Sequence, residues 1–447
     1  LDGMASLSAS TGMGYLAGNS AGSSLLRTAG LLLEHHPSTS SQEQEQAPPQ
    51  DLFFSGHLTN TIILDGLLDA YFTYYNPSYP VVHEKTFRQK YQDRHHIPPH
   101  SSWHAIFYII LAIGNWTLGH SSASKQCIYY SAARSRMSMQ MLESGTLLTI
   151  QAFLLMGNYL QKQDRPNTAS NLIGIAYRMA LGLGLHREVP TKNELLFHER
   201  RRAVWWIVYC FDSGFSLTPG RPVMGSEFIE TRLPRNIDDS ACTLSSPLPP
   251  STDHPTRYSA IIAQARLASI NNTIHTTVIS AAAAAFDIQT ARSLAHQLET
   301  WRLSLPPYFF TSHDNIPAWF QGPRAIVLWK EQNLRMMLWW GSLRLASETE
   351  DVRNMCYYMA IESIQDITAF CLDYPDCLHR GLGWYASYFL FQATVVLGFY
   401  SGLGLPEKDG LGTVNRELWI CRARECLAAL SRRTEAARRC LGVLDRM

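Results

Sequence analysis

Helical periodicity dominates the chain from Leu52 onward. Apolar positions recur at intervals of three and four residues, and the period-two alternation that marks strands is nearly absent. This pattern predicts an all-α protein, either a large multi-helix bundle or an α-solenoid-like helical body with no substantial sheet. In the second half of the chain, helices are expected at about 280–301, 325–346, 352–372, 384–402 and 414–441.

Two adjacent helices carry the densest pattern. The first ends at Gly182 and Gly184, and its apolar stripe consists of Leu172, Ile175, Ala176, Met179 and Leu183. The second follows Glu199, and one of its stripes consists of Trp205, Tyr209, Asp212 and Ser216. A carboxylate among aromatic side chains can stay charged in a dry interior only with a partner. We therefore expect Asp212 to pair with a guanidinium from Arg201, Arg202 or Arg221.

Low-complexity stretches divide the chain into four parts. Residues 1–50 are rich in Gly, Ser and Gln and form an N-terminal segment and linker, and residues 51–235 form a first helical half. Prolines, serines and acidic residues gather in 236–256, which predicts a loop over the surface. Residues 257–447 then form a second helical half.

Composition narrows the classes of function. With 447 residues, 46% hydrophobic and 17% charged, the chain can bury a large core. Its 38 basic and 37 acidic side chains leave a net charge of +1, which is unlike a stand-alone nucleic-acid binder. The apolar run at 105–114 is much shorter than the roughly 20 residues that cross a bilayer, so we expect no membrane.

Short motifs that suggest chemistry have simpler explanations. The GNSAG sequence at 18–22 has the letters of a nucleophile elbow but no preceding strand, so we expect no enzyme activity. A histidine group formed by His83, His95, His96 and His100 is interpreted as solvated rather than as a metal site. The arginines at 200–202 are assigned a structural role at a helix start, and those at 432–439 a solvated basic face. The nine cysteines include no CxxC pair, so no zinc site is expected in this chain.

The block GIAYRMALGLGLHRE, followed by ERRRAVWWIVYCFDSGFSLTPGRP, is the most specific motif of the chain. It resembles the signature of the fungal-specific regulatory domain, or middle homology region, of zinc-cluster transcription factors. The resemblance covers roughly residues 51–400. Within the family, the early segment GYLAGNSAGSSLL most resembles regulators related to the yeast galactose activator. The signature residues, which also form a candidate effector cleft, are Arg178, His186, Arg201, Arg202, Trp205, Trp206, Tyr209, Asp212 and Arg221.

The resemblance implies a nuclear regulatory domain that controls transcription by RNA polymerase II through an effector or a protein partner. Full-length members bind DNA through a cluster of six cysteines and zinc, and this cluster is missing here. Because the chain begins at Leu1, we interpret it as a fragment that itself binds neither zinc nor DNA. The implied partners are a small-molecule effector, coactivators or repressors, and a second copy of the chain. The alternative function is a homodimeric helical scaffold without small-molecule sensing.

Overall fold

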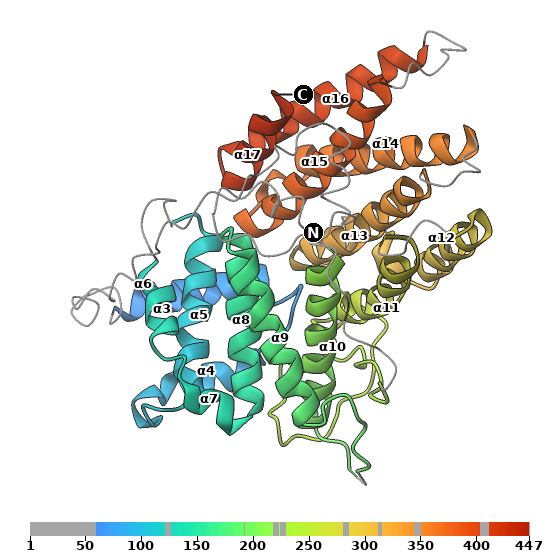
Figure 1. The fold of residues 1–447 in the computed structure, drawn as a ribbon. Helices are drawn as coiled ribbons and strands as arrows, with labels where there is room; N and C mark the ends of the chain where they lie inside the picture. Colours follow the sequence, from blue (N-terminus) through green and yellow to red (C-terminus); the bar gives the residue numbers. More distant parts are fainter. Residues whose placement is uncertain are drawn as a thin grey trace, which may run out of the picture.

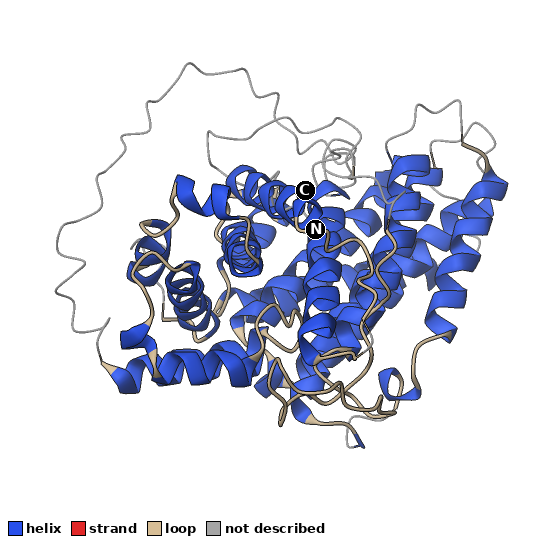
Figure 2. Cartoon of the chain, turned by 90° about the horizontal axis from the view of Figure 1, so that it is seen from below, coloured by secondary structure: helices blue, strands red, loops and turns tan. Residues whose placement is uncertain are grey.

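A computed structural model describes residues 60–446, apart from residues 121–126, 192, 218–222, 224–228, 280–285, 312–314, 344–349 and 403–410. The described residues fold into 15 α-helices with short 3-10 and π-helical turns, and they contain no strand beyond two isolated bridges. Figure 2 shows this helical character. The predicted all-α class is confirmed.

Helices of the first half lie together at the blue-to-green end of Figure 1. They are α3 (Thr61–Ala70), α4 (Glu84–Gln92), α5 (Ser102–Thr117), α6 (Ile128–Arg134), α7 (Met139–Ser144), α8 (Leu147–Lys162), α9 (Pro166–Gly182) and α10 (Leu196–Leu217). The end of α9 agrees with the prediction, because Gly184 has a φ of +64° that suits glycine in the turn.

Helices of the second half follow a long segment without helix, residues 229–258. They are α11 (Ser259–Ile274), α12 (Ile288–Leu303), α13 (Ala318–Ser342), α14 (Glu350–Asp373), α15 (Arg380–Gly402), α16 (Leu411–Ser431) and α17 (Glu435–Leu444). Neighbours in sequence are neighbours in space: α9 packs on α10, α10 on α11, α11 on α13 and α13 on α14. The α15 helix also contacts α5, so the two halves share contacts at more than one place.

The core is formed by helices that are apolar nearly all round. The α5 helix buries the apolar run 105–114, and Gly114 lies so close to α3 that an added Cβ would stand 2.1 Å from the carbonyl oxygen of Leu67. By length and composition alone, Arg380–Phe399 of α15 could cross a membrane, but 89% of that stretch is buried inside the protein. Such burial is typical of a core helix.

Three predicted helix boundaries were wrong. The helix expected at 414–441 is two helices, because Thr434 interrupts the backbone and its hydroxyl accepts a hydrogen bond from the Ala437 amide at 3.1 Å, which starts α17. The helix expected from residue 325 begins at Ala318, although it contains Pro323, a residue that usually marks a helix start. The helix expected from residue 280 begins at Ile288 after its Asp287 cap, and residues 280–285 lie outside the described part.

Candidate functional site

Three consecutive arginines on α10 reach three different environments. Successive side chains on a helix are rotated by about 100°, so neighbours in sequence face different sides. Arg200 is buried against the segment before α4, where it donates to the carbonyl oxygen of Pro80. Arg201 donates to the carbonyl oxygen of Leu183 at 3.1 Å. Arg202 faces a group of carboxylates, so the three charges of this run have three different sets of partners.

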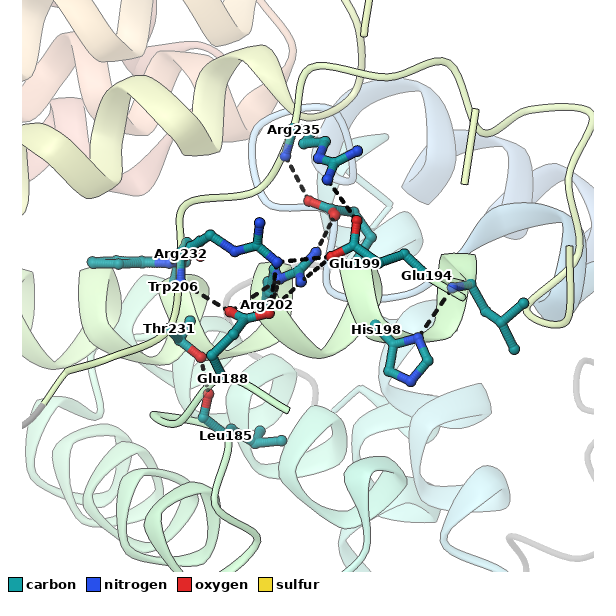
Figure 3. A network of polar contacts seen from close by, with 11 residues as sticks. Leu185, Glu188, Glu194, His198, Glu199, Arg202, Trp206, Thr231, Arg232 and Arg235 are labelled. Atoms are coloured by element: carbon teal, nitrogen blue, oxygen red, sulfur yellow. Dashed lines mark hydrogen bonds and ion pairs between the residues drawn. The ribbon is translucent and has the colours of Figure 1, made fainter. Parts of the chain in front are cut away.

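Arg202 is the centre of an ion-pair network beside α10 (Figure 3). Its side chain is 5% exposed, and its guanidinium lies 2.8 Å from Glu199 and 2.7 Å from Glu194. A third carboxylate, Glu188, accepts from its Nε at 3.0 Å. The guanidinium thus holds the turn after α9 and the start of α10 together, because Glu188 lies in that turn and Glu199 lies on the helix.

Two further arginines connect this network to the segment after α10 (Figure 3). Arg232 donates to Glu194 at 2.8 Å, and Arg235 donates to the same carboxylate at 2.5 Å. The backbone amide of Arg235 also donates to Glu199 at 2.5 Å. Trp206 completes the connection, because its indole N–H donates to the carbonyl oxygen of Arg232 at 2.9 Å. Three guanidinium groups and three carboxylates therefore fix this segment on α10.

The pKa values agree with a structural network. Burial acts to raise the pKa of Glu188, but hydrogen bonds from Arg202 and Arg232 lower it to about 2. Hydrogen bonds from Arg202 also lower the pKa of Glu194. Both carboxylates stay ionised at neutral pH and keep their guanidinium partners charged. Because every charge in this group has an opposite charge beside it, the network offers little to a ligand.

The described signature residues lie on α9, on α10 and in the turn between these two helices. Trp205 is fully buried, and its ring centroid is 5.7 Å from that of His186. Tyr209 accepts from the side-chain amide of Asn272 at 2.9 Å, which joins α10 to α11. Arg178 is exposed on α9. The described signature residues mostly pack helices together, and none of them lines the cavity described below.

The expected pairing of Asp212 with Arg201 or Arg202 was wrong. Both arginines lie on the same helix ten or eleven residues earlier, which is about 15 Å along the axis, and both bond to other groups. Asp212 is 9% exposed and lies near Tyr177, whose pKa is raised by burial and by this carboxylate. The third candidate partner, Arg221, lies outside the described residues.

A cavity of about 500 Å³ opens on the other side of α10. One wall is the face of α4 and the segment before it, and the opposite wall comes from Arg200, the segment after α10 and the turn before α11. It is lined by Asn76, Pro80, Val82, His83, Glu84, Lys85, Arg88, Gln89, Gln92, Arg200, Asp239, Ser240 and Arg257. The cavity therefore touches both halves of the molecule.

A chain of buried polar groups forms the floor of this cavity. Arg200 donates to the hydroxyl of Tyr258 at 3.2 Å, and that hydroxyl donates to Asp239 at 2.6 Å. His83 lies 3.7 Å from the same carboxylate through its Nε2. Burial lowers the pKa of His83, while Asp239 acts in the opposite direction. The floor is thus preorganised by groups from α4, α10 and the segment between the two halves.

Sequence reasoning did not find this cavity. Arg257 follows a proline-rich loop with no periodicity, and nothing in the sequence places it opposite α4. The histidine group also divides, since His83 caps α4 by accepting from the Thr86 amide at 3.4 Å. Within the described ranges, no three His, Cys, Asp or Glu side chains come together as metal ligands, so these residues do not fit a zinc cluster.

Comparison with known proteins identifies the family. The family model described as "Fungal specific transcription factor domain" matches residues 68–303, more than half of the chain. These residues contain the arginine–glutamate network and every residue that lines the cavity. The chain therefore belongs to the fungal-specific transcription factor domain family, and the resemblance to fungal zinc-cluster regulators is confirmed.

Three curated relatives illustrate the similarity. The lactose regulatory protein of Kluyveromyces lactis is 34% identical over 240 residues, which cover 52% of this chain and 25% of that protein. An ABC-transporter-regulating transcription factor of Aspergillus fumigatus is 26% identical over 263 residues, which cover 56% of this chain and 29% of that protein. The acetamidase regulatory protein of Emericella nidulans is 31% identical over 170 residues, covering 37% and 21%. The aligned part of this chain spans about a fifth to a third of the length of these regulators.

Proposed function

We propose that this chain is the regulatory body of a fungal transcription factor that acts in the nucleus on transcription by RNA polymerase II. Membership of the family supports this function, and the three relatives are named as regulators. In this proposal, a zinc-cluster module outside the described helices binds DNA. The helical body binds an effector or a coactivator or repressor, and it performs no catalysis.

The observation that carries the proposal is the cavity that touches both helical halves. Its walls come from α4, from α10 and from the turn before α11, which are far apart in the sequence. A ligand there would contact both halves, and it would favour whichever arrangement of them it binds more tightly. That difference in affinity is what couples the effector to the DNA-binding and activating segments.

A reporter experiment tests this function. Residues 1–447 would be fused between a heterologous DNA-binding domain and an activation segment, and reporter output would be compared across growth media with a fusion that lacks the body. We expect output to change with the medium only when the body is present. Equal responses of the two fusions in every medium would contradict a regulatory role.

A homodimeric scaffold is the second candidate function. Two exposed apolar side chains one turn apart on α14 favour it. Met355 is 47% exposed and Tyr358 is 60% exposed. Leu418 of the neighbouring α16 is 45% exposed. Light scattering after size exclusion distinguishes the candidates: a dimer that Tyr358→Arg converts to a monomer supports the scaffold, and a monomeric wild-type chain contradicts it.

A further inference from the structure

The cavity between α4 and the turn before α11 has an excess of positive charge. Four cationic side chains line it, Lys85, Arg88, Arg200 and Arg257, against the two carboxylates of Glu84 and Asp239. Part of this charge is already neutralised. Arg88 pairs with Glu84 at 2.9 Å and with Asp69 at 2.7 Å, and Asp239 lies on the floor near Arg200. Among the described residues, Lys85 and Arg257 form no ion pair with a carboxylate, although Lys85 donates to the carbonyl oxygen of Ala241 at 2.5 Å.

Arg257 is the group that most needs a partner. Its Nη1 is buried and has no hydrogen-bond partner among the described residues. Its guanidinium lies 4.5 Å above the ring of Trp319, which holds the side chain in place without satisfying its N–H groups. Burial lowers the pKa of Arg257, and the carboxylates of Glu84, Asp239 and Asp238 compensate only in part. A buried N–H group that lacks an acceptor is costly, so the Nη1 end of this half-buried side chain favours an anion.

The remaining lining indicates what else the ligand carries. Asn76, Gln89, Gln92 and Ser240 supply amide and hydroxyl groups that both donate and accept hydrogen bonds. Apolar lining is limited to Pro80 and Val82 and to the stems of the longer side chains. The volume of about 500 Å³ suits a molecule of metabolite size. These groups complement a polar, hydroxylated ligand better than an apolar one.

We propose that this cavity binds a small hydroxylated metabolite through a carboxylate or phosphate group, which Arg257 and Lys85 hold from opposite sides. The proposal deepens the proposed function, because it rests on that function and names the ligand class and its site. Lys85 comes from the first half of the chain and Arg257 from the second. An anion between them therefore draws the two halves together, which is the arrangement that a regulatory ligand stabilises.

Isothermal titration calorimetry of the full chain in a low-salt buffer without phosphate tests the proposal. Citrate represents carboxylates, glucose 6-phosphate represents phosphate esters, and glucose is the uncharged control. We expect saturable binding of at least one anion and none of glucose. The anion that binds identifies which oxyanion the cavity takes. Binding of neither anion, or equal binding of glucose and its phosphate, would overturn the proposal.

Variants locate the binding. Arg257→Gln removes the unsatisfied guanidinium, and we expect it to weaken anion binding at least tenfold while the melting temperature of the free protein does not fall. Arg266→Gln removes an equally charged, exposed side chain that does not line the cavity, and it should bind as the wild type does. If Arg257→Gln fails to fold, Lys85→Gln provides the second variant with the same expected loss. Wild-type affinity in a folded Arg257→Gln or Lys85→Gln protein would contradict the site.

Failure of this inference and failure of the proposed function give different results. A body that changes reporter output with the growth medium but binds no anion is a regulator with another site. A body that binds an anion through Arg257 but never changes reporter output has the site without the regulatory role.

Discussion

At the scale of single residues, Arg202 is the residue on which the signature network depends. Glu199 has no exposed surface, and Arg202 donates to it at 2.8 Å. Replacing Arg202 with Leu leaves that carboxylate buried with only the Arg235 amide beside it. We expect Arg202→Leu to lower the free energy of unfolding by about 3 to 5 kcal/mol, as the loss of one partner of a buried ion pair does. Urea unfolding at pH 7 measures the change.

The neighbouring arginine provides the control for this prediction. Arg201 donates to a backbone oxygen, that of Leu183, rather than to a buried carboxylate. Arg201→Gln should therefore cost about 3 kcal/mol or less, because a hydrogen bond with one charged partner contributes roughly 1.5 to 3 kcal/mol. Equal losses in Arg201→Gln and Arg202→Leu would mean that the network does not supply the stability.

These residues also mark how far the sequence could predict the site. A charged side chain in an apolar stripe must have a partner, and this rule singled out Asp212. The position of Arg202 at the start of a helix predicted a structural role for it. Two of the three carboxylate partners of Arg202 could not be predicted, because Glu188 and Glu194 reach it only through the path of the loop after α9. The same holds for Arg257, which no periodicity connects to α4.

At the scale of elements, the crossing of α3 and α5 depends on Gly114. An added Cβ there would lie 2.1 Å from the carbonyl oxygen of Leu67, and a backbone atom cannot turn aside as a flexible side chain can. We expect Gly114→Ala to lower the free energy of unfolding by about 1 to 3 kcal/mol or more, because α3 and α5 must separate. Thermal or urea unfolding measures the loss.

A second helical glycine supplies the matched control. Gly174 lies inside α9, and an added Cβ there meets nothing within 4 Å. Gly174→Ala should raise the free energy of unfolding by about 0.4 to 1 kcal/mol, because alanine favours the helix and restricts the unfolded chain. If Gly114→Ala stabilises the protein as Gly174→Ala does, α3 and α5 can separate at little cost.

Sequence patterns predicted the elements better than their junctions. The C-terminal end of α9 and the span of α14 follow from apolar periodicity and from glycine in the turn. The break between α16 and α17 depends on one hydroxyl, that of Thr434, in a stretch rich in residues that favour helix. Close contacts such as that of Gly114 are tertiary, so no local pattern encodes them.

At the scale of the whole molecule, a buried polar junction joins the two halves. The hydroxyl of Tyr79, from the first half, lies 2.8 Å from that of Tyr385 on α15. Lys330 on α13 donates to Tyr79 at 2.9 Å and to Gln264 on α11 at 2.6 Å. This ammonium group has neutral partners in these contacts, and burial lowers its pKa to about 8. Its protonation therefore bears on how firmly the halves hold together.

The junction predicts a stability that changes with pH in a known direction. Lysine has a pKa of about 10.5 in an unfolded chain, and Lys330 has one of about 8 in the folded protein. Between these values the unfolded state binds more protons, so the contribution of Lys330 to the free energy of unfolding rises with pH. We expect the wild type to gain about 1 kcal/mol or more over Lys330→Met between pH 7.5 and 9.5, measured by urea unfolding.

Comparison with Lys330→Met cancels the thiols and tyrosines that ionise in the same range, because both proteins contain them. Lys90→Met, which changes an exposed lysine on α4, should show the same pH dependence as the wild type. Parallel profiles for Lys330→Met and the wild type would mean that the ammonium group is solvated and does not join the halves. If the free energy of unfolding rises with pH only in proteins that contain Lys330, a ligand that shifts the two halves would also change the proton affinity of Lys330. In that case, a ligand in the cavity should alter the alkaline profile of the wild type and leave that of Lys330→Met unchanged.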